Sequence, residues 1–425
     1  MQSGVTLWTL HELQEALGLP VEGENIAVTS VHTDSREIVK ESLFIALPGE
    51  KQHGVEFADQ AVKNGAAILL VPQKVEADIP QLVVTDTREA FLKLAKTARA
   101  RMQGKIIAIT GSAGKTTTKD LLVGALQAHG PVGSFNNHVG VPLTLVRMPQ
   151  NSKYAVIEMG MNAPGEIEPL TKLAQPDIAV VLNVYPVHTH TFDGVEGVRK
   201  EKLSIAHGLS ENGTLVVPED LNLEGVNWHG NVEKFNPEGA LPCPITHETP
   251  ARVACANAAV AVLNILEENT PKTLNRLGQV PVPAGRGRVM DINGITLIDD
   301  SYNANPKSMD AALNVLLKQS AKRHIAILGD MFELGEEEIT YHQNLSKWAE
   351  KLDNLTCVGN LMNHLYTKVK DVPHVNYIEN VPSIDVHKLA ATFQEGDVIL
   401  VKGSKGMFWI HNFTQKLQKC LEERP

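Results

Sequence analysis

Residues 105–122 read Lys-Ile-Ile-Ala-Ile-Thr-Gly-Ser-Ala-Gly-Lys-Thr-Thr-Thr-Lys-Asp-Leu-Leu, an apolar strand that runs into a glycine turn and then into a helix. Gly111 and Gly114 allow the backbone to turn tightly and expose its N–H groups, while the following helix N-terminus adds its positive dipole end. In such a turn, Lys115 reaches the β- and γ-phosphates of a nucleotide and the Thr116 hydroxyl binds Mg²⁺. Two residues rather than four separate the glycines, so the spacing departs from the common P-loop. We predict a phosphate-binding turn that comprises Gly111, Ser112, Gly114, Lys115, Thr116 and Thr117.

Length and composition indicate a globular protein of several domains. The chain has 425 residues, enough for about three domains that each bury a core, and it is 43% hydrophobic and 21% charged. Its net charge of −10 argues against a nucleic-acid partner, which would require a basic face.

The cysteines and the hydrophobic segments indicate the cellular compartment in which the protein is expected. The four cysteines show no Cys-x-x-Cys spacing, so neither a zinc site nor a disulfide framework is predicted, and a reducing compartment fits. The N-terminus lacks a basic stretch followed by an apolar one, and no run approaches eighteen apolar residues. We expect a cytoplasmic protein without membrane insertion.

The hydrophobic pattern predicts an α/β fold. Thr9–Leu17 is typical of an amphipathic helix with Thr9 as its N-cap, and a second helix is expected over 90–102. Continuous apolar runs bounded by polar turns are typical of buried parallel strands. The expected strands are 41–47, 66–71 and 81–85, then 105–110, 154–158, 177–184 and 213–217, and finally 295–299, 324–328, 356–358 and 397–401. The expected linkers are the polar stretch before Lys105 and residues 281–285.

Polar residues that follow these strands are candidates for chemistry, because ligands of doubly wound sheets collect beyond the carboxyl ends of the strands. Glu158 ends one strand, His188 follows the next, and Lys202 lies on a predicted helix. With Thr116, Glu158 and His188 would offer Mg²⁺ ligands, although histidine is an uncommon ligand for that ion. Each also has an ordinary interpretation, as a strand-end surface glutamate, a solvated loop histidine and a solvated helix lysine.

Motifs elsewhere in the chain favour the functional interpretation of Glu158, His188 and Lys202 over the ordinary one. The chain resembles the Mur ligase family over nearly its whole length. The resemblance rests on the segments 33–36 (Thr-Asp-Ser-Arg), 43–46 (Leu-Phe-Ile-Ala), 110–119, 136–145 (Asn-Asn-His-Val-Gly-Val-Pro-Leu-Thr-Leu), 158–167, 183–188 leading to Lys202, 299–309, 328–335 and 401–406. The strings Tyr302-Asn-Ala-Asn-Pro306 and Gly329-Asp-Met-Phe-Glu-Leu-Gly335 are similar to those of the member that adds D-alanyl-D-alanine.

This resemblance implies three domains: 1–103 for the UDP-substrate, a central P-loop ATPase domain over 104–284 with a mostly parallel sheet, and a Rossmann-like domain over 285–425. It implies Mg²⁺ at Thr116, Glu158 and His188, and a second Mg²⁺ at a carbamylated Lys202. Lys115, Lys202 and His188 would be catalytic. The further residues implied are Asn257, Arg286, Asp300, Tyr302 and Asn303 for the nucleotide, and Asp34, Ser35, Arg36, Asn136, Asn137 and Asn305 for the substrate.

The activity implied is ATP-dependent ligation of D-alanyl-D-alanine to UDP-N-acetylmuramoyl-tripeptide through an acyl phosphate, by a monomer. A related Mur or folylpolyglutamate-type amide ligase and a non-catalytic nucleotide-binding switch are the alternatives. The absence of an Asn-Lys-x-Asp string disfavours a GTPase form of the switch. Departures from the family pattern occur at His138, His190, Thr191, Val253 and Lys405.

Overall fold

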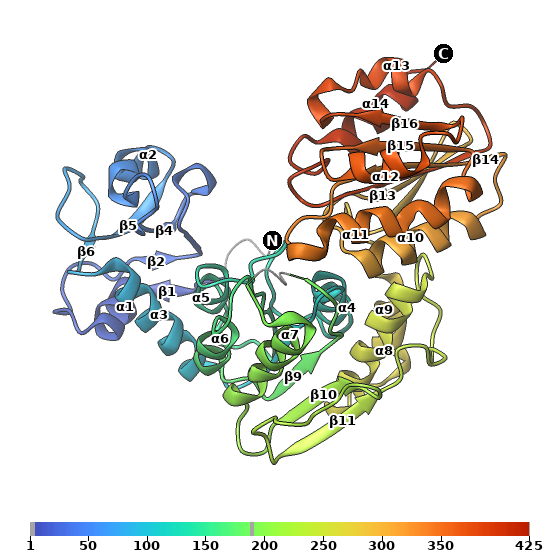
Figure 1. The fold of residues 1–425 in the computed structure, drawn as a ribbon. Coiled ribbons are helices and arrows are strands. Elements are labelled where there is room, and N and C mark those ends of the chain that lie inside the picture. Colours follow the sequence, from blue (N-terminus) through green and yellow to red (C-terminus); the bar gives the residue numbers. More distant parts are fainter. Residues whose placement is uncertain (1–4, 188–190, 425) are drawn as a thin grey trace.

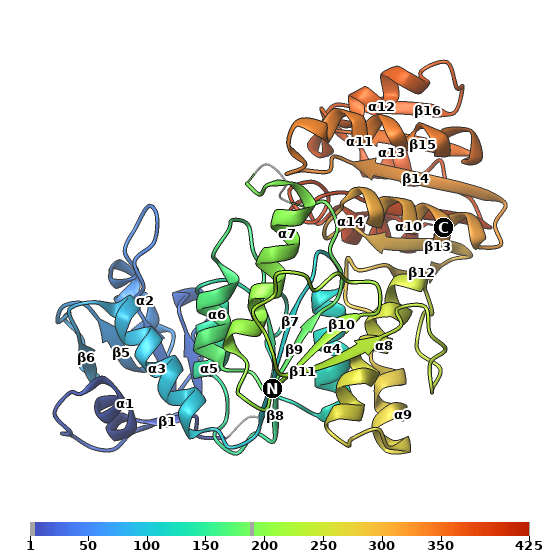
Figure 2. The same cartoon turned by 60° about the horizontal axis from the view of Figure 1, so that its bottom comes forward.

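In the part of the chain that the structure describes, four β-sheets form three successive α/β units (Figure 1). A computed structural model describes residues 5–187 and 191–424. The middle unit lies between the N-terminal and C-terminal units in both views (Figures 1 and 2). This arrangement confirms the expected three-domain α/β architecture. No helix in the described part of the chain has the length and apolar character needed to cross a membrane.

The N-terminal unit contains a parallel four-stranded sheet and an antiparallel strand pair. The pair is β1 (Trp8–Thr9) with β2 (Ala27–Val28), and the sheet order is β3 (Ser30–His32), β4 (Ser42–Ile45), β5 (Ala66–Val71) and β6 (Gln81–Val83). The helices are α1 (Leu10–Leu17), α2 (Ala58–Lys63) and α3 (Thr87–Arg101). Thr9 caps α1, as expected, in a capping box with Glu12.

The central sheet is parallel and five-stranded. Its order is β11 (Asn231–Phe235), β10 (Thr214–Pro218), β9 (Ile178–Val181), β7 (Lys105–Thr110) and β8 (Tyr154–Glu158). The helices are α4 (Lys115–Leu126), α5 (Gly140–Val146), α6 (Ile167–Ala174), α7 (Gly194–Leu203), α8 (Pro250–Ile265) and α9 (Pro271–Gln279). Alternate residues of β7 point into two different cores, one on each face of the sheet. Because β7 lies between β8 and β9 and pairs in parallel with both, the carboxyl ends of these three strands lie along one edge of the sheet.

The C-terminal sheet has six strands and is parallel except at β12. Its order is β12 (Arg288–Ile292), β13 (Ile295–Asp300), β17 (Asp397–Lys402), β14 (Arg323–Gly329), β15 (Asn354–Val358) and β16 (Val375–Ile378). The helices are α10 (Pro306–Lys318), α11 (Glu338–Gln343), α12 (Met362–Val369), α13 (Val386–Ala390) and α14 (Phe413–Glu422). β17 lies between β13 and β14, so the carboxyl ends of β13 and β17 are neighbours.

Buried strands agree with the sequence expectations more closely than exposed ones. All eleven expected strands form, with ends that differ by at most a few residues, whereas β1, β2, β3, β11, β12 and β16 were not expected. β11 is exposed at four of its five positions, and β12 lies at a sheet edge with charged residues. Such strands lack the apolar run by which the buried ones were recognised.

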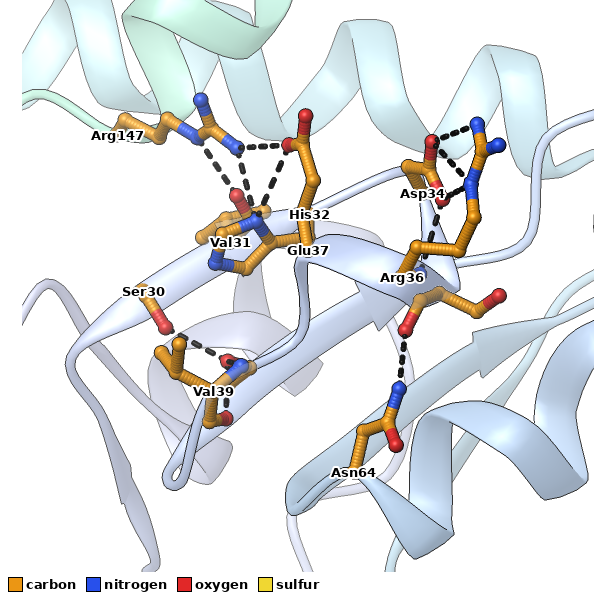
Figure 3. A network of polar contacts seen from close by, with 11 residues as sticks. Ser30, Val31, His32, Asp34, Arg36, Glu37, Val39, Asn64 and Arg147 are labelled. Atoms are coloured by element: carbon orange, nitrogen blue, oxygen red, sulfur yellow. Dashed lines mark hydrogen bonds and ion pairs between the residues drawn. The ribbon is translucent and has the colours of Figure 1, made fainter.

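The N-terminal and central units share a continuous core. Apolar residues from Leu7 to Met102 pack in one cluster with residues of the central unit. The Trp8 indole donates a hydrogen bond to the Val146 carbonyl at 2.8 Å. Arg147 donates to the Val31 carbonyl at 2.6 Å and contacts His32 and Glu37 of the N-terminal unit (Figure 3). The two units are therefore fastened together by both apolar and polar contacts.

Candidate active site

The phosphate-binding turn joins β7 to α4 in the expected strand–turn–helix arrangement. Gly114 caps α4 with a φ of 84°, and a Cβ at this position would lie 2.7 Å from the Cys255 sulfur. A side chain is therefore excluded on both conformational and steric grounds. The ammonium of Lys115 donates to the Gly111 carbonyl at 2.7 Å, which folds this side chain back over the turn.

Glu158 is the polar centre beside the turn. Its Oε2 accepts a hydrogen bond from the Thr116 hydroxyl at 2.9 Å. Its Oε1 accepts hydrogen bonds from the Ser134 hydroxyl at 2.9 Å and the Asn136 amide at 2.7 Å. Only 1% of Glu158 is exposed, so the interpretation as a strand-end surface residue is wrong. Buried carboxylates need such donors, because an unpaired one costs several kcal/mol.

The loop after β9 is tied to the phosphate-binding turn. The Asn183 side chain accepts from the Ala113 N–H at 2.9 Å, and the Asn183 carbonyl accepts from the Ser112 N–H at 3.2 Å. The Ser112 hydroxyl also accepts from the Tyr185 N–H at 2.9 Å. This loop leads toward His188, which, like His190, lies outside the described residues.

Lys202 lies on α7 and is buried, with 2% of the residue exposed. The interpretation as an ordinary solvated helix lysine is therefore wrong. Its ammonium contacts the Met161 sulfur at 3.8 Å, and the adjacent Glu201 accepts hydrogen bonds from the N–H groups of Gly165 and Ile167. Burial, reinforced by the nearby Lys115, holds the pKa of Lys202 well below its ordinary value. The neutral amine is thus accessible at this position.

The donor set beside the turn fits a hard cation. The described residues contain no group of three or more His, Cys, Asp and Glu side chains that could hold a metal ion by themselves. Thr116 and Glu158 nevertheless present a hydroxyl and a carboxylate at 2.9 Å from each other. Mg²⁺ favours this kind of site, in which one or two protein oxygens act together with phosphate oxygens.

Arg286 brings the C-terminal unit into the site. Its guanidinium donates to the Thr116 hydroxyl at 3.1 Å and lies over the Tyr302 ring, 3.7 Å from the centroid. The Tyr302 ring in turn packs edge-on against Trp409, with centroids 5.1 Å apart. The aromatic face and the hydroxyl together fix the orientation of Arg286.

A cavity of about 430 Å³ lies between the central and C-terminal units. Ser112, Ala113 and Gly114 line it on one side, and Asp300 and Asn303 line it on the other. Cavities of this size accommodate small-molecule ligands. The phosphate-binding turn and the carboxyl end of β13 therefore face the same space.

Other expected site residues have structural partners of their own. Asn257 does not line this cavity; its amide donates to the Gly239 carbonyl at 2.8 Å and holds the loop next to Pro237, which does. Asn137 accepts from the N–H groups of Val139 and Gly140 and so stabilises the start of α5. Asn305, expected at the substrate, caps α10 and lines the cavity.

The expected uridine residues lie in the N-terminal unit. Asp34 binds the Arg36 guanidinium through both carboxylate oxygens, and the Arg36 side chain is 84% exposed (Figure 3). Ser35 is buried, and its carbonyl accepts from the Asn64 amide at 2.8 Å. Arg36 is therefore the accessible cation of this segment.

Four departures from the family pattern fall in the described residues: His138, Thr191, Val253 and Lys405. Thr191 donates to the Asn162 carbonyl at 2.7 Å, and the Lys405 ammonium lies 5.6 Å from the Tyr302 ring centroid. His138 is exposed and Val253 is half-buried.

The polar residues of the site that were not assigned from the sequence include Ser134, Asn183 and Lys402. Asn183 and Lys402 each lie in a motif near a strand end, which was the available signal. Ser134 lies in the loop before α5 and carried no comparable signal.

Comparisons with known proteins agree with this geometry. Three family models match: the catalytic domain of the Mur ligase family at residues 27–114, the Mur ligase middle domain at 109–238, and the Mur ligase glutamate ligase domain at 285–405. The UDP-N-acetylmuramoyl-tripeptide–D-alanyl-D-alanine ligase of Escherichia coli (strain K12) is 33% identical, over 93% of this chain and 95% of that protein.

The chain belongs to the Mur ligase family.

Solved structures extend the likeness to the whole fold of this Mur ligase. MurF from Acinetobacter baumannii is 29% identical with a TM-score of 0.83, covering 97% of this chain and 99% of that one. MurF ligase from Thermotoga maritima, solved in complex with ADP, is 26% identical with a TM-score of 0.78, covering 94% and 99%. The resemblance identified from the sequence motifs is therefore confirmed.

Proposed function

We propose that this Mur ligase uses ATP to join D-alanyl-D-alanine to UDP-N-acetylmuramoyl-tripeptide, a step of peptidoglycan precursor synthesis in the cytoplasm. The observation that carries the proposal is the juxtaposition of the phosphate-binding turn with buried Glu158 and buried Lys202. The likeness to ligases of this name over nearly the whole chain supports the choice of substrates. We further propose the domain limits 1–103, 104–284 and 285–425.

The chemistry explains why cations are gathered here. A carboxylate is a poor electrophile, so the γ-phosphoryl group of ATP is first transferred to a carboxylate oxygen of the tripeptide, with release of ADP. Two anions must approach each other in this step, and catalysis consists mainly of positioning and charge stabilisation. Lys115 and Arg286 are placed to supply positive charge beside the phosphate-binding turn.

Bound Mg²⁺ would neutralise part of the negative charge of the phosphate oxygens. Thr116, Glu158 and His188 would hold one ion, and Lys202 the second. Ser134 and Asn136 orient Glu158 so that its carboxylate stays beside Thr116.

Lys202 would act in a modified form. Its neutral amine can react with CO₂ to give a carbamate, which replaces a potential cation by an anion with two oxygens. The lowered pKa of Lys202 supports this assignment, because burial favours the amine that reacts. The ammonium form could not bind a cation.

The second step forms the amide. The amine of D-alanyl-D-alanine attacks the carbonyl carbon of the acyl phosphate, a C–N bond forms, and the C–O bond to phosphate breaks. Positive charge beside the turn stabilises the oxyanion of the tetrahedral intermediate. The nitrogen loses a proton, and inorganic phosphate leaves with the carboxylate oxygen.

An acceptor screen tests the proposal. The purified chain is incubated with ATP, Mg²⁺ and UDP-N-acetylmuramoyl-tripeptide carrying diaminopimelate or lysine at the third position, and phosphate release is measured with each acceptor. We expect release only when the tripeptide and D-alanyl-D-alanine are both present. Release with glutamate or a single amino acid instead would identify a related ligase, and nucleotide binding without co-substrate-dependent release would identify a switch.

A further inference from the structure

Lys402 and Asp300 form a buried ion pair at the carboxyl ends of adjacent strands. The two residues are direct register partners on β17 and β13. The Lys402 ammonium lies 2.6 Å from the Asp300 Oδ2 and donates a second hydrogen bond to the Asn303 carbonyl at 3.1 Å. The Lys402 side chain is 2% exposed and that of Asp300 is 21% exposed. The lysine therefore lies behind the carboxylate, and the carboxylate lies toward the opening.

The pair faces the cavity shared with the phosphate-binding turn. Asp300, Asn303 and Lys402 all line this cavity, opposite Ser112 and Gly114. Oδ2 of Asp300 is taken by Lys402, while Oδ1 accepts no hydrogen bond from any residue that the structure describes. One carboxylate oxygen is thus left for a ligand.

The preceding carboxylate shows what a purely structural aspartate looks like in this strand. Asp299 Oδ2 accepts from the Gly285 N–H at 2.9 Å, and its Oδ1 accepts from the hydroxyl and N–H of Ser301. Both of its oxygens are used inside the protein, and Asp299 does not line the cavity. Asp299 therefore has a structural role, whereas Asp300 keeps one oxygen for a ligand.

We propose that Lys402 is a positioning residue for the nucleotide, which holds Asp300 as a carboxylate whose free oxygen accepts hydrogen bonds from the ribose hydroxyls. The inference rests on the proposed use of ATP. A carboxylate at the end of a strand is the usual acceptor for ribose hydroxyls in dinucleotide-binding folds. Burial raises the pKa of Asp300, and the positive charge of Lys402 opposes that rise. Without Lys402 the carboxyl group would lose both its orientation and its main source of stabilising charge.

The test compares ligands that differ only at the ribose. ADP and 2′,3′-dideoxy-ADP are titrated in Mg²⁺ into the wild type, Lys402→Met and Asp300→Asn by calorimetry. We expect the wild type to prefer ADP by roughly tenfold or more, the range of a hydrogen bond to a charged group. In both variants the ratio of the two dissociation constants should fall close to one. The exposed Lys416 of the same domain provides the control Lys416→Met, which should keep the wild-type ratio.

Other outcomes overturn the inference in distinguishable ways. A wild-type ratio that persists in Lys402→Met contradicts it, whatever happens to thermal stability. If Lys402→Met does not fold, the double variant Asp300→Asn/Lys402→Met, which buries no unpaired charge, must show the lowered ratio. Loss of discrimination between ADP and IDP instead would mean that Asp300 reads the adenine. Failure of ADP to bind the wild type would contradict the proposed function rather than the role of Lys402.

Discussion

The Arg286 guanidinium donates a hydrogen bond to the Thr116 hydroxyl at 3.1 Å, and so connects the C-terminal unit to the first turn of α4. The same hydroxyl donates a hydrogen bond to Glu158, so it accepts one hydrogen bond and donates the other. Arg286 follows Gly285, which has a φ of 72°, and its planar face rests on Tyr302. One arginine therefore links the aromatic packing of one unit to the phosphate-binding turn of another.

Arg286→Lys should weaken ADP binding by about tenfold, because lysine has neither the planar face nor the fork of donors that satisfies Tyr302 and Thr116 together. Calorimetric titration with ADP and Mg²⁺ measures the effect. Arg288 is exposed two residues further along and provides the matched control Arg288→Lys. Equal affinity of the two variants would show that the contact between Arg286 and Thr116 does not contribute to nucleotide binding.

Lys115→Ala should abolish turnover and leave binding of the UDP-linked tripeptide largely unchanged. The ammonium folds over the phosphate-binding turn, whereas the expected uridine residues lie in the N-terminal unit. Turnover and UDP-tripeptide affinity are measured separately on the same folded preparation. Loss of both together would contradict the proposed assignment of 1–103 to the UDP end.

Lys202→Ala should inactivate the enzyme, and Lys202→Arg should not restore it, because neither side chain can become a carbamate. Acetate or propionate should recover part of the activity of the alanine variant by replacing the missing anion. Lys200 lies on the same helix with a 72% exposed side chain, so Lys200→Ala should behave as the wild type. Near-full activity of Lys202→Arg would exclude the carbamate.

The C-terminal unit should lose stability as the pH falls below about 6.5. His342 is buried, its Nε2 accepts from the Met331 N–H at 2.9 Å, and its Nδ1 lies 2.6 Å from the Glu338 carbonyl, so the neutral ring is the form that fits. Burial lowers the pKa of His342 below the model-peptide value of 6.5. The folded state then binds fewer protons than the unfolded state.

The contribution of His342 is therefore complete above pH 6.5 and declines on acidification, by at most about 1.4 kcal/mol per pH unit. Denaturant unfolding at several pH values measures this slope, which His342→Gln should reduce. An unchanged slope in that variant would assign the acid sensitivity to other groups.

The sequence located the phosphate-binding turn because all of its parts are local: an apolar strand, two glycines and a helix start within residues 105–122. Glu158 could be proposed because it ends a recognisable strand. Its burial could not, since Ser134 and Asn136 reach it from a separate loop. Likewise, the burial of Lys202 depends on the packing of α7 against the loop that contains Met161. Contacts between residues distant in the chain determine these environments, and local patterns do not encode them.

The central claim is that one carboxylate oxygen leaves with the phosphate of ATP. The tripeptide is labelled with ¹⁸O at its terminal carboxylate and incubated with the enzyme, ATP, Mg²⁺ and D-alanyl-D-alanine, and the products are analysed by mass spectrometry. The account predicts UDP-N-acetylmuramoyl-pentapeptide, ADP and inorganic phosphate in equal amounts, with one ¹⁸O from the carboxylate in the phosphate. Pentapeptide formed together with unlabelled phosphate would contradict the acyl-phosphate route.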